Sequence, residues 1–129
     1  MIKGIQDIYY TVTDVKRSIQ FYTEALQMKL MFEDDGWTAM ECGGIQIGLH
    51  PTDPGEEIFK VPRDSHGAHG QATLTLKSDN IPEDRTRIEG NGGKILGEVD
   101  APWGHVLVFE DLDGNVLKLM KPSLVQAEG

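Results

Sequence analysis

The sequence predicts an α+β fold built from two modules, each with the element order βαβββ. Both halves of the chain open with a strand in which apolar and polar residues alternate, and a stretch with helical spacing follows each strand. Each half then ends in a hairpin turned at glycine. We therefore expect one domain over residues 1–129, made of a first module (about 5–50), a connector (51–70) and a second module (71–121).

The first module begins with the stretch GIQDIYYTVTD, whose alternation predicts a strand with one buried face. The next stretch, DVKRSIQFYTEALQ, predicts an amphipathic helix over about 14–27, with Thr13 or Asp14 as its N-cap. KLMFED is a further predicted strand, and GWTAMECGGIQIGL is a predicted hairpin turned at Gly43 and Gly44. The apolar residues at helical spacing are Val15, Ile19, Tyr22 and Leu26.

The connector holds three prolines and three glycines without a clear period, and its length favours a lid or a linker between modules. The second module then repeats the order of the first. QATLTLK predicts a strand, and Pro82 opens a predicted helix over about 82–90 that ends at glycines. KILGEV predicts the next strand, and GHVLVFEDLDGNVLKLM predicts a hairpin turned at Asp113 and Gly114. The whole chain should thus contain two helices and about eight strands.

The repeat identifies equivalent positions in the two modules. The hairpin turns take the same place in both halves, so Gly48 is equivalent to Lys118, and the first strands align Asp7 with Gln71. Lys118 falls on the polar face of a half-buried strand. A buried lysine needs an anionic partner or a shell of hydrogen bonds. We therefore expect one of these around the ammonium of Lys118.

Composition excludes several classes of function. The formal net charge is −9 and the twelve basic residues are scattered, which argues against nucleic acid or an anionic membrane as a partner. No stretch approaches the ~20 apolar residues of a membrane span. Cys42 is the single cysteine, which rules out an internal disulfide and favours a packing role for its thiol. With no signal-peptide pattern at the N-terminus, we expect a cytoplasmic protein.

The element order and three stretches of sequence resemble the vicinal oxygen chelate superfamily. These stretches are TDVKRSIQFYTEALQMKL after the first strand, EGNGGKILGE after the second helix and PWGHVLVFEDLDGNVLKLM at the end. The superfamily contains glyoxalase I, bleomycin-resistance proteins, fosfomycin-resistance enzymes and extradiol dioxygenases. The resemblance covers residues 5–121 and implies curved mixed sheets with U-shaped clefts, the glyoxalase/bleomycin-resistance fold.

The resemblance also implies where a metal would be held. A glyoxalase-like enzyme would carry a His or Gln at positions 7 and 71 and a Glu at positions 48 and 118. This chain has Asp7, Gly48, Gln71 and Lys118 there. Glycine offers no donor atom, and a lysine ammonium has hydrogen-bond donors but no acceptor, so it repels a divalent cation. We therefore expect no metal and no cofactor at the usual site.

A shifted metal site is an alternative that the sequence leaves open. His50 and His69 would both face the cleft, where Asp7 and Glu41 could join them. However, His69 lies in the glycine-rich connector, and the set lacks the close spacing of a typical metal motif.

Strand alternation assigns polar and aromatic side chains to the predicted cleft, as in ligand pockets. Trp37 and Trp103 are placed either at its rims or in the core. We expect the ammonium of Lys118 to reach Asp7, Gln71 or a bound anion, and no residue is assigned a catalytic role. The predicted ligand-binding residues are Asp7, Tyr9, His50, Gln71, Thr73, Trp103 and Lys118.

These expectations favour metal-free binding of a small organic molecule between modules, as in bleomycin-resistance proteins, with a role in antibiotic resistance. An enzyme is the alternative, either a glyoxalase-like lyase with an atypical metal site or a metal-free acid–base catalyst that uses Lys118, His50 or Asp7. A homodimer is expected, because modules of the superfamily often pair between chains and half-barrels leave open sheet edges.

Overall fold

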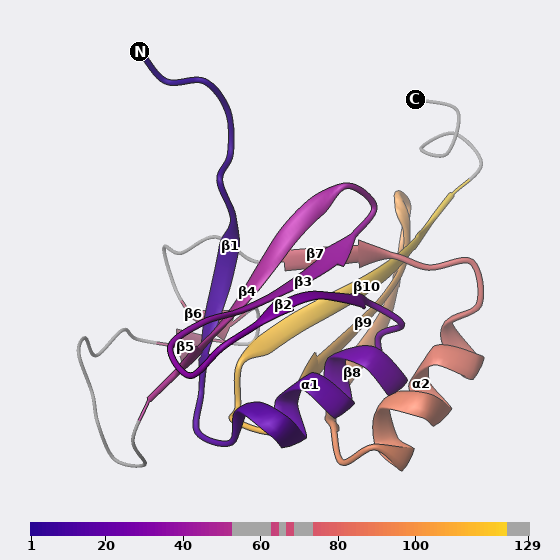
Figure 1. Cartoon of the computed structure of the whole chain (residues 1–129). Coiled ribbons are helices and arrows are strands. Elements are labelled where there is room, and N and C mark those ends of the chain that lie inside the picture. The colour runs from indigo at the N-terminus through magenta and orange to yellow at the C-terminus, as the bar shows by residue number, and fades with distance from the viewer. Residues whose placement is uncertain (53–62, 65–66, 69–73, 124–129) are drawn as a thin grey trace. The chain divides into compact units, whose positions relative to one another are not determined.

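The computed structural model of the chain describes residues 1–52, 63–64, 67–68 and 74–123 (Figure 1). The chain divides into two compact units, Met1–Glu56 and Glu57–Gly129. The division falls inside the predicted connector, so each unit contains one of the predicted modules.

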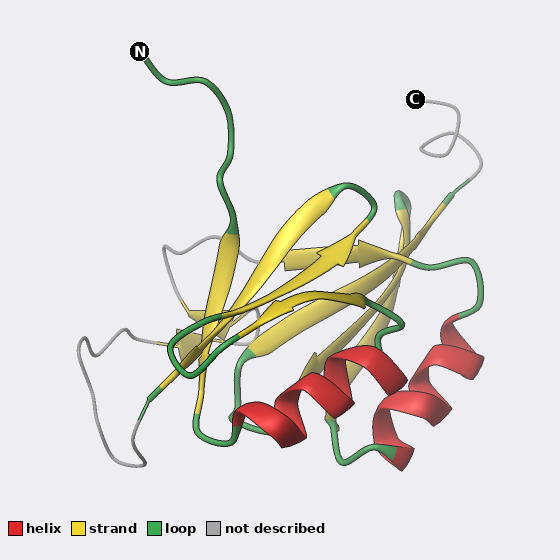
Figure 2. Cartoon of the chain, in the orientation of Figure 1, coloured by secondary structure: helices red, strands yellow, loops and turns green. Residues whose placement is uncertain are grey.

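The first unit is a four-stranded mixed sheet with one helix (Figure 2). Its strands lie in the order β1-β4-β3-β2, with β1 parallel to β4 and the other neighbours antiparallel. The parallel pair requires a crossover connection, which begins with the helix. The elements are β1 (Ile8–Val12), α1 (Val15–Glu24), β2 (Lys29–Glu33), β3 (Thr38–Cys42) and β4 (Ile45–Pro51).

The second unit repeats this topology, with a four-stranded sheet in the order β7-β10-β9-β8 and β7 parallel to β10. The prediction of two βαβββ modules is therefore confirmed. A short antiparallel ladder of β5 and β6 lies in the stretch predicted as a connector, where prolines and glycines gave no strand signal. The elements are β5 (Arg63–Asp64), β6 (Gly67–Ala68), β7 (Leu74–Lys77), α2 (Ile81–Gly90), β8 (Lys94–Ala101), β9 (Gly104–Glu110) and β10 (Val116–Pro122).

Helix α1 follows its predicted cap. The carboxylate of Asp14 accepts a hydrogen bond from the backbone N–H of Arg17 at 3.1 Å, which satisfies one of the free donors at the helix start. The predicted apolar stripe is only partly right, because Tyr22 alone of its four members is fully buried and Phe21, outside the stripe, is 1% exposed. The buried side chains at this face are Ser18, Phe21, Tyr22 and Ala25.

Helix α2 begins with a reciprocal cap. The side chain of Asn80 accepts from the backbone N–H of Glu83 at 3.2 Å and donates back to the Glu83 carboxylate at 3.1 Å. Ile81 and Ile88 are buried on the helix, and they complete a core with apolar residues of the sheet. The fully buried sheet residues of this unit are Leu107, Phe109 and Leu117.

The predicted alternation of faces holds in the middle of the first sheet and fails at its end. Ile47 and Leu49 are buried as expected, whereas Ile8 and Ile45 are 37% and 50% exposed. Helix α1, with ten residues, is about 15 Å long, but β4, with seven residues, spans about 23 Å. A helix this short cannot cover the full strand, so apolar residues at the strand end stay in contact with solvent.

Within the part of the chain that the structure describes, no helix is long and apolar enough to span a membrane.

Candidate functional site

The candidate site involves one position in the last strand of each module, Gly48 in the first and Lys118 in the second. Gly48 of β4 lies opposite Tyr9 of β1, and Lys118 of β10 lies opposite Thr75 of β7. Both positions fall on the sheet face opposite the buried core, because their neighbours Leu49 and Leu117 are fully buried. The two modules therefore carry different chemistry at equivalent places.

In the second module, the register between β7 and β10 differs by two residues from the one that the alignment of the modules implies. The alignment of Asp7 with Gln71 implies that Thr73 lies opposite Lys118. The structure has Thr75 there, two residues further along the strand. A shift by two residues keeps every side chain on its original face, so the alternation in the sequence could not distinguish the two registers.

In the first unit, the indole of Trp37 covers Gly48. A Cβ atom added to Gly48 would lie 2.1 Å from Cη2 of Trp37, far inside contact distance. The preceding turn fixes the backbone of Trp37, since Oδ1 of Asp34 accepts hydrogen bonds from the backbone N–H groups of Gly36 (2.8 Å) and Trp37 (2.9 Å). No side chain can therefore project from position 48 unless the ring of Trp37 moves.

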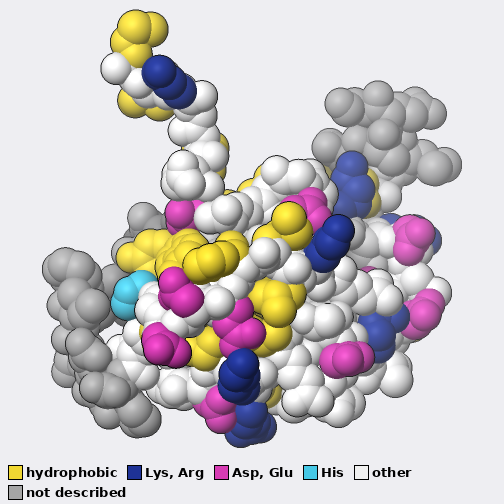
Figure 3. Space-filling model, viewed as in Figure 1, with side chains coloured by type: hydrophobic (Ala, Val, Ile, Leu, Met, Phe, Trp, Pro, Cys, Tyr) yellow, Lys and Arg dark blue, Asp and Glu magenta, His cyan; other side chains and the backbone are white. Residues whose placement is uncertain are grey.

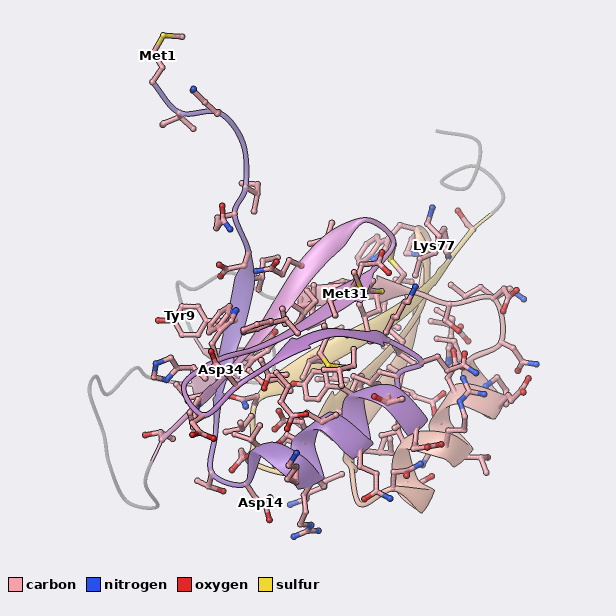
Figure 4. The ribbon with its side chains drawn as sticks, viewed as in Figure 1. Met1, Tyr9, Asp14, Met31, Asp34 and Lys77 are labelled. Atoms are coloured by element: carbon pink, nitrogen blue, oxygen red, sulfur yellow. The ribbon has the colours of Figure 1, made fainter. Side chains whose placement is uncertain are left out.

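Trp37 forms an aromatic cluster with Tyr9 and His50. The ring centroids of Tyr9 lie 5.9 Å from Trp37 and 6.0 Å from His50, and those of Trp37 and His50 lie 6.5 Å apart. Tyr9 projects from β1 and is 56% exposed (Figure 4). Figure 3 shows hydrophobic side chains adjoining a histidine on one face of the molecule. Two of the predicted ligand-binding residues of this unit, Tyr9 and His50, thus form an aromatic surface with Trp37.

The alternative metal site finds no support among the described residues. His50 lies opposite Thr11, whereas Asp7 precedes Ile8 at the other end of β1, and Ile8 and Thr11 are on the order of 10 Å apart. The carboxylate of Glu41 instead accepts a hydrogen bond from the backbone N–H of Gly44 at 2.5 Å. Within the described ranges, no group of three or more His, Cys, Asp or Glu side chains is placed to hold a metal ion.

In the second unit, Lys118 lines a pocket of about 650 Å³ on the sheet face opposite α2. This volume lies in the usual range for small-molecule sites. Most of the lining side chains are apolar; they come from strands β8, β9 and β10, and Trp103 comes from the turn between β8 and β9. The lining residues are Thr75, Leu96, Gly97, Glu98, Val99, Trp103, Val106, Val108, Lys118 and Met120.

Glu98 lines the pocket, but its carboxylate is engaged elsewhere. One oxygen accepts a hydrogen bond from Arg85 of α2, and the other lies 2.7 Å from Nε2 of His105. These two hydrogen bonds, that of His105 first, hold the pKa of Glu98 below its ordinary value. Lys118 is the one basic side chain among the described residues that line the pocket.

His105 lies between two carboxylates. Its Nδ1 is 2.5 Å from Oδ1 of Asp100, and its Nε2 faces Glu98. Both contacts are hydrogen bonds only if both ring nitrogens carry protons, so the pair of acids favours the imidazolium. Asp100 first, and then Glu98, raises the pKa of His105. The sequence interpretation did not single out His105, although two acids spaced two apart on the strand before it were a visible signal.

The turn that leads into β10 is organised by Asp111, which is 5% exposed. Its Oδ1 accepts from the backbone N–H groups of Asp113 and Asn115, both at 2.9 Å, and its Oδ2 accepts from the amide of Asn115 at 2.9 Å. The predicted turn at Gly114 is present, with φ of 80°. Asp111 therefore fixes the start of the strand that carries Lys118, a role that the sequence interpretation missed.

Cys42 ends β3 and is half-buried. Burial raises the pKa of its thiol, and the neighbouring charge of Glu41 raises it further. A thiol that stays protonated at neutral pH is a poor nucleophile, so a packing role suits Cys42.

The predicted ligand-binding residues fall into two groups. Tyr9 and His50 belong to the aromatic cluster of the first unit, and Asp7 lies half-buried just before β1. Trp103 and Lys118 line the pocket of the second unit. The approach of Lys118 to Asp7 stays a prediction. The remaining predicted residues, Gln71 and Thr73, and His69 of the alternative metal set lie outside the described residues.

Comparison with protein families supports the predicted fold. The sequence model of the Glyoxalase/Bleomycin resistance protein/Dioxygenase superfamily matches residues 4–119. Metallothiol transferase FosB from Staphylococcus haemolyticus is 28% identical over 127 residues, covering 96% of this chain and 87% of the relative. FosB from Staphylococcus epidermidis has the same identity and coverage.

Solved structures share the fold at low identity. The fosfomycin resistance protein FosX from Listeria monocytogenes superposes with a TM-score of 0.73 at 19% identity, covering 98% of both chains. A variant of that protein, in complex with Mn(II) and 1S,2S-dihydroxypropylphosphonic acid, gives the same TM-score. A glyoxylase/bleomycin resistance protein/dioxygenase domain from Frankia gives 0.71 at 23% identity, covering 96% of this chain and 95% of that domain.

Proposed function

Because the chain belongs to the Glyoxalase/Bleomycin resistance protein/Dioxygenase superfamily, we propose that it binds a small organic molecule without a metal ion, and that the pocket lined by Lys118 is its site. The proposal separates this chain from a relative such as FosX, which has been solved with Mn(II).

The observation that carries the proposal is the pair of positions where superfamily metal enzymes place glutamate ligands. Gly48 has no side chain, and the indole of Trp37 occupies the space that one would need. Lys118 brings a positive charge to the equivalent position, where it repels a cation. The described residues at these positions therefore do not fit a divalent metal ion, and the proposed binding does not depend on one.

The composition of the pocket supports binding of an organic molecule. Ligand sites are mostly apolar, with a few polar groups that fix orientation. Here the side chains of Val106, Val108 and Met120 supply apolar surface, while Lys118 and Thr75 supply polar groups. Sequestration of a toxic compound is a function that needs no catalyst, and it suits a protein that shares its fold with the fosfomycin resistance protein FosX.

We also propose that the protein acts as a homodimer in the cytoplasm. Edge strand β2 supports association, since Leu30, Met31 and Phe32 on it are 40%, 58% and 51% exposed. Exposed apolar edge strands are prone to pair with another chain. Light scattering would give the mass of a dimer, and the mass of one chain at micromolar concentration would contradict this part of the proposal.

The binding proposal is tested by a fragment screen on protein freed of metal with a chelator. Methyl-resolved NMR should reveal compounds that shift the methyl signals of Val106, Val108 and Met120, with the same affinity in chelator and in added Mn(II). Compounds that bind only when metal is added would contradict the proposal. A screen in which no compound shifts these methyl groups would do the same.

A further inference from the structure

The aromatic cluster of Tyr9, Trp37 and His50 has no part in the binding proposed for the pocket lined by Lys118. We infer that this cluster is a second binding site, and that it takes the methylated ammonium head of an organic cation, such as a trimethylammonium group. The inference goes beyond the proposed function, because the residues of the cluster belong to the first unit and those of the pocket belong to the second.

The geometry of the three rings suits a compact, round group. Their centroids form a nearly equilateral triangle with sides of 5.9, 6.0 and 6.5 Å, and the ring planes are inclined to one another by 67°, 48° and 65°. Rings inclined in this way do not stack flat on one another, so parts of their faces stay available to a group above them. A point above the middle of the triangle lies roughly 4–5 Å from all three centroids, inside the ~6 Å limit of a cation–π contact.

The cluster is open to solvent, and the backbone beneath it is fixed. Tyr9 is 56% exposed, and His50 is exposed as well. The backbone of Trp37 is tied to Asp34 twice, since its N–H donates to Oδ1 of Asp34 and its carbonyl accepts from the N–H of Asp34, both at 2.9 Å. The indole in turn lies against Gly48. A ligand therefore meets rings that need little ordering, which lowers the entropy cost of binding.

Negative charge around the cluster selects the sign of its ligand. The turn that carries Trp37 also carries Asp34 and Asp35, which are both exposed. The carboxylate of Asp34 contacts the backbone N–H of Trp37, so it lies at the base of the indole. Figure 3 shows acidic side chains beside the hydrophobic side chains that adjoin the histidine. Residues 1–52 contain seven acidic and four basic side chains, and the field of this unit therefore favours a cation.

The chemistry of the rings favours an organic cation over a metal ion or a neutral apolar group. Ring faces attract a positive charge through their quadrupole, and within the described ranges no set of His, Cys, Asp and Glu side chains is placed to hold a metal ion. Methyl groups on a nitrogen bury apolar surface against the rings. A neutral group of the same shape gains this apolar contact and lacks the attraction to the ring faces.

The test is an NMR titration with choline and with 3,3-dimethylbutan-1-ol, which has the same shape without the charge. It is run at about pH 8, where an ordinary imidazole is neutral and does not repel a cation. The chain has two tryptophans, Trp37 and Trp103, so two indole N–H signals report on the two units. We expect choline to shift the signal of Trp37 and not that of Trp103, and to bind at least about 5-fold more tightly than the alcohol. Potassium chloride at the same concentration should leave both signals in place.

Matched variants separate the rings and the charge from general effects. Tyr9→Phe keeps a ring and should retain most of the choline binding, whereas Tyr9→Leu should weaken it about 3-fold or more. Asp34→Asn keeps an oxygen for the hydrogen bonds of the turn and removes the charge, so it should weaken choline about 2-fold and leave the alcohol unchanged. Glu24→Gln makes the same change of charge at an exposed residue of α1 and should leave choline binding unchanged. Thermal unfolding of each variant establishes that it is folded.

Four results would overturn the inference. If choline leaves the Trp37 signal in place, or shifts that of Trp103 instead, the cluster is not its site. If the alcohol binds as tightly as choline, or potassium chloride gives the same shift, the inferred ligand class is wrong. If Tyr9→Leu binds choline as well as Tyr9→Phe does, the rings do not hold the cation. If Asp34→Asn weakens choline no more than Glu24→Gln does, the acidic turn does not select the charge. None of these results affects the pocket lined by Lys118, because its own test reads the methyl signals of the second unit.

Discussion

The two modules have one topology, and they differ most at equivalent points of their last strands. In the first module the point is Gly48, buried beneath the ring of Trp37 and surrounded by aromatic side chains. In the second module it is Lys118, on the floor of a pocket with aliphatic walls. The indole of Trp37 covers the sheet face at Gly48, whereas the sheet face at Lys118 forms a pocket. Duplication of a fold thus does not duplicate a site, because a few side chains decide whether a sheet face is surface or pocket.

The turns that lead into these strands provide the largest contrast. Asp111 is 5% exposed and accepts three hydrogen bonds in its turn, whereas Glu41 in the first module accepts one from Gly44 in an exposed turn. Asp111→Ala should lower the free energy of unfolding by about 3 kcal/mol, because buried donors lose a charged acceptor. Glu41→Ala should cost less than about 1 kcal/mol. Urea unfolding of both variants measures the difference, and equal losses would contradict this assignment.

The ring over Gly48 gives the next largest effect. Gly48→Ala should destabilise the protein by about 2 kcal/mol, since the new methyl group collides with Trp37 and forces the ring to move. In a Trp37→Ala background, the same substitution should cost much less. The coupling in this double-mutant cycle, from chemical denaturation, reports the contact directly. Additive effects would mean that the indole does not occupy the space above Gly48.

A core position differs between the modules in polarity. Thr38 pairs with Leu49 in the first sheet, and Leu107 pairs with Leu119 at the matching place in the second. Thr38 is 0% exposed, and among the described atoms its Oγ1 has no hydrogen-bond partner. Thr38→Val keeps the shape and removes an unsatisfied hydroxyl, so it should raise the free energy of unfolding by about 1 kcal/mol. Thr38→Ser, which keeps the hydroxyl and removes the methyl group, should instead destabilise the protein in the same assay.

The smallest expected effect is a dependence of the free energy of unfolding on pH. The first module ties α1 to β2 through Lys16 and Glu33, whereas in the second module Glu98 of β8 contacts both Arg85 of α2 and His105 of β9. Asp100 and Glu98 raise the pKa of His105 in the folded state. Its contribution is therefore complete below the ordinary histidine pKa and is lost as pH rises through the folded value.

His105→Gln should remove this dependence and lower stability on the acidic side only, by less than about 1 kcal/mol because the group is partly exposed. Denaturation curves of both proteins across this pH window provide the measurement. Parallel stability profiles for wild type and variant would show that His105 stays neutral between its two acids.

The sequence was sufficient for the fold because local patterns and the repeat agreed with each other. Alternation located the first strand of each module and glycine turns located the hairpins, whereas β5 and β6 were not predicted. Thr13 or Asp14 was expected to cap the first helix, where the structure has Asp14, and Pro82 marked the start of the second. The site was harder to predict. Lys118 stood out because it replaces an expected acid, and it does line a pocket. The ring of Trp37 over Gly48 depends on a turn conformation, and the links of His105 depend on pairing across a hairpin. Neither feature has a periodic signature.

The register of the second module shows a further limit. A strand that slides by two residues keeps the same face toward the core, so the sequence could not choose between Thr73 and Thr75 as the neighbour of Lys118. The register decides which side chains lie beside each other on a sheet face, and so which of them can line a site there. Prediction of a site therefore requires the register as well as the order of the elements.

The metal content of the purified protein shows most directly whether its site works without a divalent metal ion. Elemental analysis of the purified chain, followed by calorimetric titration of the stripped protein with Mn(II) and Zn(II), would measure it. We expect substoichiometric metal and no saturable binding, because Gly48 is covered by Trp37 and Lys118 is cationic. Lys118→Glu, which restores an acid at the usual position, should bind these ions more tightly than wild type. One tightly bound ion per wild-type chain, lost on substitution of residues next to Lys118, would show that the site is a metal site.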